Sequence, residues 1–219
     1  MLTTVFPTNP ALLDRSRLRT AIPAALRSDS VQVLVLISMG VVAAALTTYV
    51  HMRMRIPGHK IVLNVLPMGC GLAFAPRRNA GLLLALSSTL AWIGFNFEDA
   101  RWIIDEPSEA IIELGAIASL GSLGILLDLA GRVARSGKSF YVAFAAAGFT
   151  SNYITFAAKL VQRNLDDGST RIRYSEWIGR APLSFAVCGL LAGLIAAGIF
   201  FQFSEGKHRP HDGNTPSAA

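Results

Sequence analysis

The chain has 219 residues, of which 52% are hydrophobic and 16% are charged, and its formal net charge at pH 7 is +6. Soluble domains contain about 25% charged residues, so this composition excludes an ordinary soluble domain. The basic residues lie beside apolar stretches, where they attract anionic lipid head groups. We therefore expect a lipid bilayer, and no nucleic acid, as the partner of this surface.

A basic segment, residues 1–30, precedes the first apolar stretch. That stretch is followed by Arg53 and Arg55 and not by a small-residue cleavage site, so we do not expect a cleaved signal peptide. The segment is predicted to be a cytoplasmic tail or an amphipathic helix on the membrane surface. An organellar transit sequence is the remaining alternative.

Six apolar stretches of about 16 to 24 residues follow, which is the length that crosses a hydrocarbon core of roughly 30 Å as a helix. They lack the apolar–polar alternation of barrel strands. The sequence therefore predicts an all-α, polytopic integral membrane protein with about six transmembrane helices within residues 31–203. The stretches are 31–50, 61–75, 80–97, 110–129, 140–160 and 181–203.

The first stretch contains Gly40 and Ala44 at a spacing that lets two helix backbones approach closely. This pair is a candidate surface for binding a partner helix, and internal packing is the alternative. Gly115 with Ser119, and Gly189 with Gly193, repeat the spacing.

The connection to the second stretch contains Arg55, the turn signal Pro57-Gly58, and then His59 and Lys60. Cations at a helix mouth either anchor the helix end at the level of the lipid head groups or bind an anionic ligand.

Polar and ionisable residues within or beside the other spans are also candidates, because such groups are costly in lipid. Glu113 follows Glu109 by four residues, a repulsive spacing that Arg101 or a ligand would relieve. Asp128 is explained by an ion pair with Arg132 one turn later. The candidate substrate-binding residues are Arg55, His59, Asn64, Asn96, Glu98, Asp99, Glu113 and Asn152.

Two later segments complete the chain. Residues 162–180 mix charges with aromatic residues and are predicted to form an interfacial helix or a lid. Residues 204–219 lack apolar periodicity and are predicted to be a disordered tail. The loops 76–79 and 131–139 contain bases and no acids, so the positive-inside rule places both termini in the cytoplasm.

No catalytic or metal-binding motif is present: the sequence has no Gly-x-Ser-x-Gly, no His-Glu-x-x-His and no paired cysteines at metal spacing. The glycines of Gly131–Ser139 do not have phosphate-loop spacing. We expect no enzymatic activity, no cofactor and no metal.

Six short spans, the small-residue pair in span one, and the segments Arg55-Ile-Pro-Gly-His-Lys60 and Pro76-Arg-Arg-Asn-Ala-Gly81 resemble the substrate-binding (S) components of energy-coupling-factor transporters. The resemblance implies a small-molecule ligand in an outward pocket and a location in the bacterial inner membrane. It also implies that Gly40 and Ala44 dock on a transmembrane coupling protein driven by ATPases. The family usually has alanine at both positions of that pair.

Two other functions fit the same residues. A non-catalytic scaffold subunit of a membrane complex would direct the polar residues to separate surfaces. A lipid-modifying enzyme would bring Glu98, Asp99 or Glu113 close to His59 for acid–base chemistry. The placement of the polar side chains around one cavity or on separate surfaces distinguishes these functions.

Overall fold

The computed structural model describes residues 28–50, 56–75, 79–97, 107–134, 136–165 and 171–205. All regular structure in these residues is helical, which confirms the all-α prediction for this part of the chain. Each predicted span coincides with one helix. The helices are α2 (Asp29–Tyr49), α3 (Ile61–Phe74), α4 (Ala80–Phe95), α6 (Pro107–Val133), α7 (Gly137–Leu165) and α8 (Arg171–Glu205).

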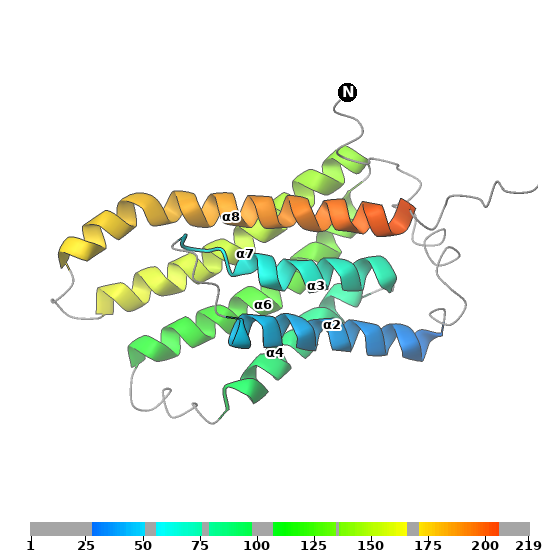
Figure 1. Ribbon diagram of the computed structural model, residues 1–219, viewed down its shortest axis with the longest axis horizontal. Helices are drawn as coiled ribbons and strands as arrows, with labels where there is room; N and C mark the ends of the chain where they lie inside the picture. Colours follow the sequence, from blue (N-terminus) through cyan, green and yellow to red (C-terminus); the bar gives the residue numbers. More distant parts are fainter. Residues whose placement is uncertain are drawn as a thin grey trace, which may run out of the picture.

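Successive helices run in opposite directions along the long axis of the molecule (Figure 1). The start of α2, in blue, and the end of α8, in red, therefore lie at the same end, which we call the terminal end. The end of α2 and the starts of α3, α6 and α8 point the other way. We call this second end the cavity end.

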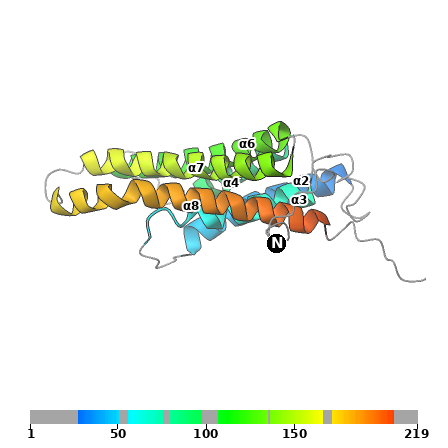
Figure 2. The same cartoon turned by 90° about the horizontal axis from the view of Figure 1, so that it is seen from above.

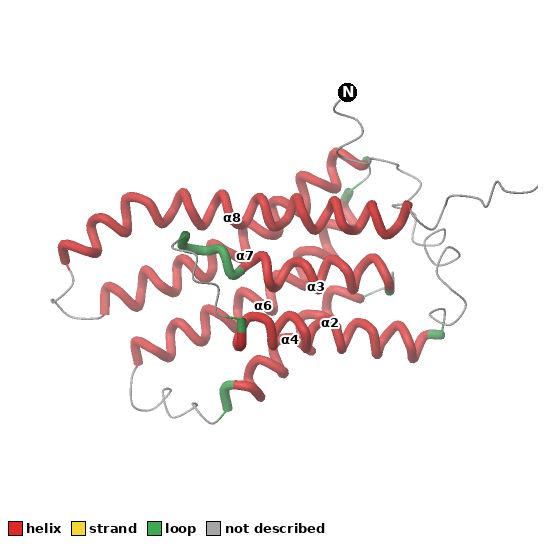
Figure 3. The backbone as a smooth tube through the Cα atoms, viewed as in Figure 1, coloured by secondary structure: helices red, strands yellow, loops and turns green. Residues whose placement is uncertain are grey.

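The six helices close into a ring. Around it, α2 contacts α4, α4 contacts α6, α6 contacts α7, α7 contacts α8, α8 contacts α3, and α3 contacts α2. Figure 2 shows α6 and α7 on one side of the molecule and α2, α3 and α8 on the other. Figure 3 shows the short loop that precedes α3 lying against this bundle. A ring of this kind can enclose a space wherever its side chains do not fill it.

Glycines permit the close approach of neighbouring helices in this ring. A side chain at Gly193 of α8 would collide with the backbone of Phe144 in α7, and one at Gly81 of α4 would collide with the backbone of Gly124 in α6. A side chain at Gly115 of α6 would collide with the side chain of Ala158 in α7. These contacts hold the helix backbones together without large side chains between them.

Gly40 and Ala44 also lie in an internal contact. A side chain at Gly40 would collide with Ser87 of α4, and Ala44 is completely buried. The two residues are therefore packed inside the bundle, as the internal-packing alternative predicts. They do not form an exposed face to which a partner could bind.

Phenylalanine rings fill the bundle at the terminal end. The ring centroids of Phe140 and Phe144 in α7 are 4.2 Å apart, and those of Phe140 and Phe200 in α8 are 4.8 Å apart. Phe201 meets Phe140 edge-on at 5.2 Å. Such aromatic pairs contribute about 0.5–1.5 kcal/mol each beyond their burial.

A polar cluster ties α4 to α6 at the same end. Arg132 pairs with Asp128, as the sequence predicts, and also donates a hydrogen bond of 3.0 Å to the side-chain oxygen of Asn79. Asn79 has a positive φ of 67° and directly precedes α4. This cluster and the phenylalanine rings thus lie together at the terminal end.

Three of the helices are long and apolar enough to cross a membrane: Asp29–Tyr49, Glu109–Val133 and Trp177–Gln202. Large apolar side chains are exposed on several helices, among them Leu90 at 66%, Val142 at 69% and Leu183 at 71%. Exposed apolar surface of this extent fits a lipid environment. The described helices are thus compatible with a membrane environment, whereas six membrane crossings remain an expectation.

The segment 162–180 differs from its prediction. Residues 162–165 complete α7, and Arg171–Arg180 are the first turns of α8, which continues through Pro182. The described part of this segment therefore continues α7 and α8 and does not form a separate interfacial helix. The predicted N-terminal segment lies outside the described residues up to residue 27, and the predicted tail does so after Glu205.

Candidate solute-binding cavity

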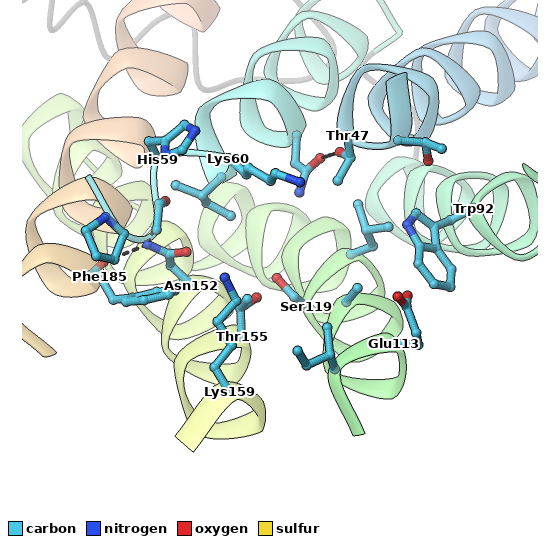
Figure 4. Close-up of a pocket in the computed structure, with 18 of the residues that line it drawn as sticks. Thr47, His59, Lys60, Trp92, Glu113, Ser119, Asn152, Thr155, Lys159 and Phe185 are labelled. Atoms are coloured by element: carbon cyan, nitrogen blue, oxygen red, sulfur yellow. Dashed lines mark hydrogen bonds between the residues drawn. The ribbon is translucent and has the colours of Figure 1, made fainter. Parts of the chain in front are cut away.

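A cavity of about 580 Å³ lies inside the ring at the cavity end. This volume is within the range of about 300–1,000 Å³ that is usual for small-molecule sites. Every described helix and the loop before α3 contribute to its wall (Figure 4). The polar and aromatic lining includes Thr47 of α2, Lys60 of the loop, Asn64 of α3, Trp92 of α4, Glu113 of α6, Lys159 of α7 and Phe185 of α8.

The loop before α3 forms part of the wall because two neighbouring helices hold it in place. Asn152 of α7 donates hydrogen bonds to the carbonyl oxygens of Gly58, at 3.2 Å, and Phe185, at 2.7 Å. Ser184 of α8 donates to the carbonyl oxygen of Pro57 at 2.7 Å. Two of these acceptors, the carbonyl oxygens of Pro57 and Gly58, belong to the loop, and irregular backbone needs such partners in a water-poor environment.

Gly58 is required at this point for two reasons. Its φ of +82° lies in the left-handed region, where residues with a side chain are strained. A side chain there would also come within 2.9 Å of Asn152 and Phe185. The Pro57-Gly58 turn signal in the sequence therefore marks a loop packed tightly against α7 and α8.

The helix that follows the loop, α3, has only 14 residues. At 1.5 Å per residue it is about 21 Å long, shorter than a hydrocarbon core. The backbone N–H groups of Val62 and Leu63 bond to the carbonyl oxygens of His59 and Lys60. These N–H groups are therefore already occupied, and the positive charge at the start of α3 comes mainly from side chains.

Five of the eight candidate residues line this one cavity: His59, Asn64, Asn96, Glu113 and Asn152. They come from the loop and from α3, α4, α6 and α7, so only the ring arrangement brings them together. The other three, Arg55, Glu98 and Asp99, lie outside the described residues.

Several of these side chains support the wall. Asn64 accepts a short hydrogen bond from Thr47, which joins α3 to α2. Asn96 donates to the carbonyl oxygen of Trp92 at 2.8 Å, at the end of α4. A ring nitrogen of His59 bonds to the carbonyl oxygen of Ile56, within the loop itself. Each of these residues thus has at least one side-chain atom in a hydrogen bond within the protein.

The charged lining is divided between two regions. Lys60 and Lys159 extend into the cavity from the loop and from α7, while Glu113 lies beside Trp92 on another side (Figure 4). Lys60 is exposed and Lys159 is half-buried. The ammonium nitrogen of Lys159 lies 5.6 Å from the centroid of the Phe185 ring.

Lys159 is a residue that the sequence analysis missed, because it lies one position before the end of a predicted span. A signal was present: Asn152, Thr155 and Lys159 are spaced three and four residues apart, and all three line the cavity. A polar row on one face of an apolar helix indicates a face turned toward water or a ligand.

An aromatic cluster forms the wall between α7 and α8. The ring centroids of Phe156 and Trp177 are 5.7 Å apart, and those of Phe156 and Phe185 are 5.5 Å apart. Arg163 lies over the Trp177 ring at 4.2 Å. The cavity therefore offers flat apolar surface as well as hydrogen-bonding groups.

Two further observations bear on what the cavity binds. The hydroxyl oxygen of Thr48, which lines the cavity, is shielded from solvent and lacks a hydrogen-bond partner within the described part of the chain. Among the described residues, no group of three or more His, Cys, Asp or Glu side chains is placed to hold a metal ion.

Searches of protein-family models, curated proteins and solved structures find no match for this chain. The class of protein therefore rests on the fold and the cavity: a ring of helices with a polar and aromatic cavity at one end.

Proposed function

We propose that this chain is a membrane-embedded, non-catalytic solute-binding subunit that serves the uptake of a small molecule. The observation that carries the proposal is the cavity of about 580 Å³ whose wall is shared by all the described helices. A space of this size, with convergent polar groups on an apolar wall, is typical of ligand sites between the helices of a bundle.

The loop before α3 supports both a membrane location and a ligand site. Irregular backbone at membrane depth is tolerated where it lines a cavity and its polar groups find partners. Transporters often form their solute sites from such interrupted helices. On this proposal all six helices cross the bilayer, and the loop with α3 forms one crossing between them.

The same role is the one implied by the resemblance to S components of energy-coupling-factor transporters. A coupling protein and ATPases in the cell membrane are then the expected partners, and both termini are cytoplasmic. Since Gly40 is packed against α4, the docking surface for such a partner must lie elsewhere on the bundle.

The scaffold alternative is less well supported, because five polar candidates share one cavity and do not face separate surfaces. The enzyme alternative also has less support, because His59 is engaged with a carbonyl of its own loop. The scaffold alternative also leaves the unfilled space inside the ring unexplained.

Native mass spectrometry of the protein, purified in mild detergent with its bound molecules, tests the proposal. The informative variant is Ala116→Trp, which places a large side chain into the cavity wall. Ala118→Trp is the matched control, because Ala118 is an exposed residue of the same helix. We expect a co-purifying small molecule in the wild type and in Ala118→Trp, and none in Ala116→Trp.

The partners in the same spectra extend the test. A co-purifying coupling protein with ATPases would support the hypothesis that the chain is a transporter subunit. An empty wild-type chain in a stable complex with other proteins would contradict the proposal in favour of the scaffold.

A further inference from the structure

We propose that the cavity selects an organic anion, a carboxylate-type solute with an apolar body, and that Lys60 and Lys159 are the residues that hold its charged group. This inference rests on the proposed solute-binding function and specifies its ligand. It starts from an imbalance of charge inside the ring.

Two positive side chains share one part of the cavity. Lys60 comes from the loop, Lys159 comes from α7, and both extend into the same space (Figure 4). Lys159 lies within electrostatic range of Lys60 and of Arg163, two groups of its own sign. Like charges beside a low-dielectric wall repel each other more strongly than they would in water.

No carboxylate within the described part of the chain pairs with Lys60 or Lys159; the ion pair found there is the one between Asp128 and Arg132, at the terminal end. The acidic side chain that lines the cavity, Glu113, lies on another side of it, next to Trp92. A half-buried cation without a counter-charge is unfavourable. An anionic group of the solute would supply the missing charge.

Anchoring of a helix end at the head groups does not account for Lys159. Such lysines extend outward along the helix to reach water, whereas Lys159 extends into the ring and lies over Phe185. Arg163, one turn nearer the end of α7, is the residue in the anchoring position, and it lies over Trp177. Lys159 therefore faces the solute space.

The remaining lining defines the rest of the ligand. Trp92, Ile112 and Leu120 present apolar surface in the same cavity, and Thr48 and Thr155 present hydroxyl groups. An aromatic or aliphatic body with few hydrogen-bonding groups fits this lining. A bare inorganic anion would leave most of the 580 Å³ unfilled.

The charge of the cavity can be measured without knowing the ligand. Thr155→Cys, in a chain whose own cysteines are replaced (Cys70→Ala, Cys188→Ala), places one thiol in the lining. Two reagents of similar size are then compared: 2-sulfonatoethyl methanethiosulfonate, an anion, and 2-trimethylammonioethyl methanethiosulfonate, a cation. In each reaction the thiolate attacks the reagent's sulfenyl sulfur, a mixed disulfide forms and methanesulfinate leaves.

The informative quantity is the ratio of the anion rate to the cation rate, divided by the same ratio for free 2-mercaptoethanol. We expect the normalised ratio at Thr155→Cys to be on the order of tenfold, since a cationic cleft concentrates anions by this much or more. Adding Lys60→Met and Lys159→Met should return it to near one. Lys138→Met, a change at an exposed lysine of the terminal end, should leave it unchanged.

The outcomes separate this inference from the proposed function. A ratio near or below one in the parent chain, with both reagents reacting, would overturn the anion assignment and leave an open solute cavity. No reaction with either reagent in a folded, monodisperse protein would overturn both. The Lys159→Met chain is expected to fold, because methionine is an adaptable, unbranched side chain only one atom shorter than lysine and the change removes a repelled charge.

Discussion

The two ends of the bundle are formed by the same helices but packed in opposite ways. At the terminal end, α7 contributes Phe140 and Phe144, which stack on rings of α8 and fill the ring of helices. Three turns further along, α7 contributes Asn152, Thr155 and Lys159, which line open space. One end is optimised for packing, and the other keeps a volume that tighter packing would remove.

The stability of the fold comes mainly from contacts between the helices. The glycine contacts between α7 and α8, and between α4 and α6, hold the ring closed. At the cavity end, hydrogen bonds from α7 and α8 also hold the loop before α3 in place. We therefore expect substitutions at the helix contacts to affect folding, and substitutions around the loop to affect the cavity.

The largest effect is expected at Gly193, where a side chain would meet the backbone of Phe144. Gly193→Val must separate α7 from α8 and should destabilise the protein by about 3 kcal/mol or more. We expect loss of monodisperse protein, or a much lower Tm, in size-exclusion chromatography and thermal unfolding in detergent.

Gly179→Ala is the matched control, because Gly179 of the same helix has no atom within 4 Å of the added carbon. Alanine is a better helix former than glycine by about 1 kcal/mol, so this variant should be at least as stable as the wild type. Equal stability of Gly193→Val and the wild type would contradict the packing account.

An intermediate effect is expected for Asn152→Leu. The change removes both hydrogen bonds of the side-chain amide and leaves the Gly58 and Phe185 carbonyls without this donor. The cost is about 1–3 kcal/mol, and it falls on the loop more than on the ring. Trypsin should cleave the released loop after Lys60 several-fold faster than in the wild type.

Thr150→Leu is the control for this variant, because Thr150 is exposed on the same helix. Its proteolysis rate should match that of the wild type. If Asn152→Leu were as resistant to trypsin as this control, Asn152 would not be the residue that holds the loop.

The sequence predicted the helices well because span length and composition act locally. The six apolar stretches coincide with six helices, and the Asp128–Arg132 pair follows from helical spacing alone. The start of α8 was missed because the charged and aromatic residues of Arg171–Arg180 are typical of a membrane interface, whereas the helix extends through them and Pro182.

The cavity could be predicted only in part. Asn64, Asn96 and Asn152 stood out as polar residues in apolar spans, but no local pattern says that they meet; this depends on the order of helices around the ring. The local sequence also does not indicate whether Gly40 packs inside the bundle or lies on a docking surface. Lys159 was hidden by its position near a span end, where a lysine is unremarkable.

The bundle has a cavity at one end and packed aromatic rings at the other, and this difference can be measured. Two single-cysteine chains test it most directly: Thr155→Cys, in the cavity lining, and Ala147→Cys, buried two turns away on the same helix. Labelling with the neutral reagent 2-hydroxyethyl methanethiosulfonate should modify the thiol at position 155 rapidly and leave position 147 unmodified. Similar rates at the two positions, or faster labelling at position 147, would contradict the account.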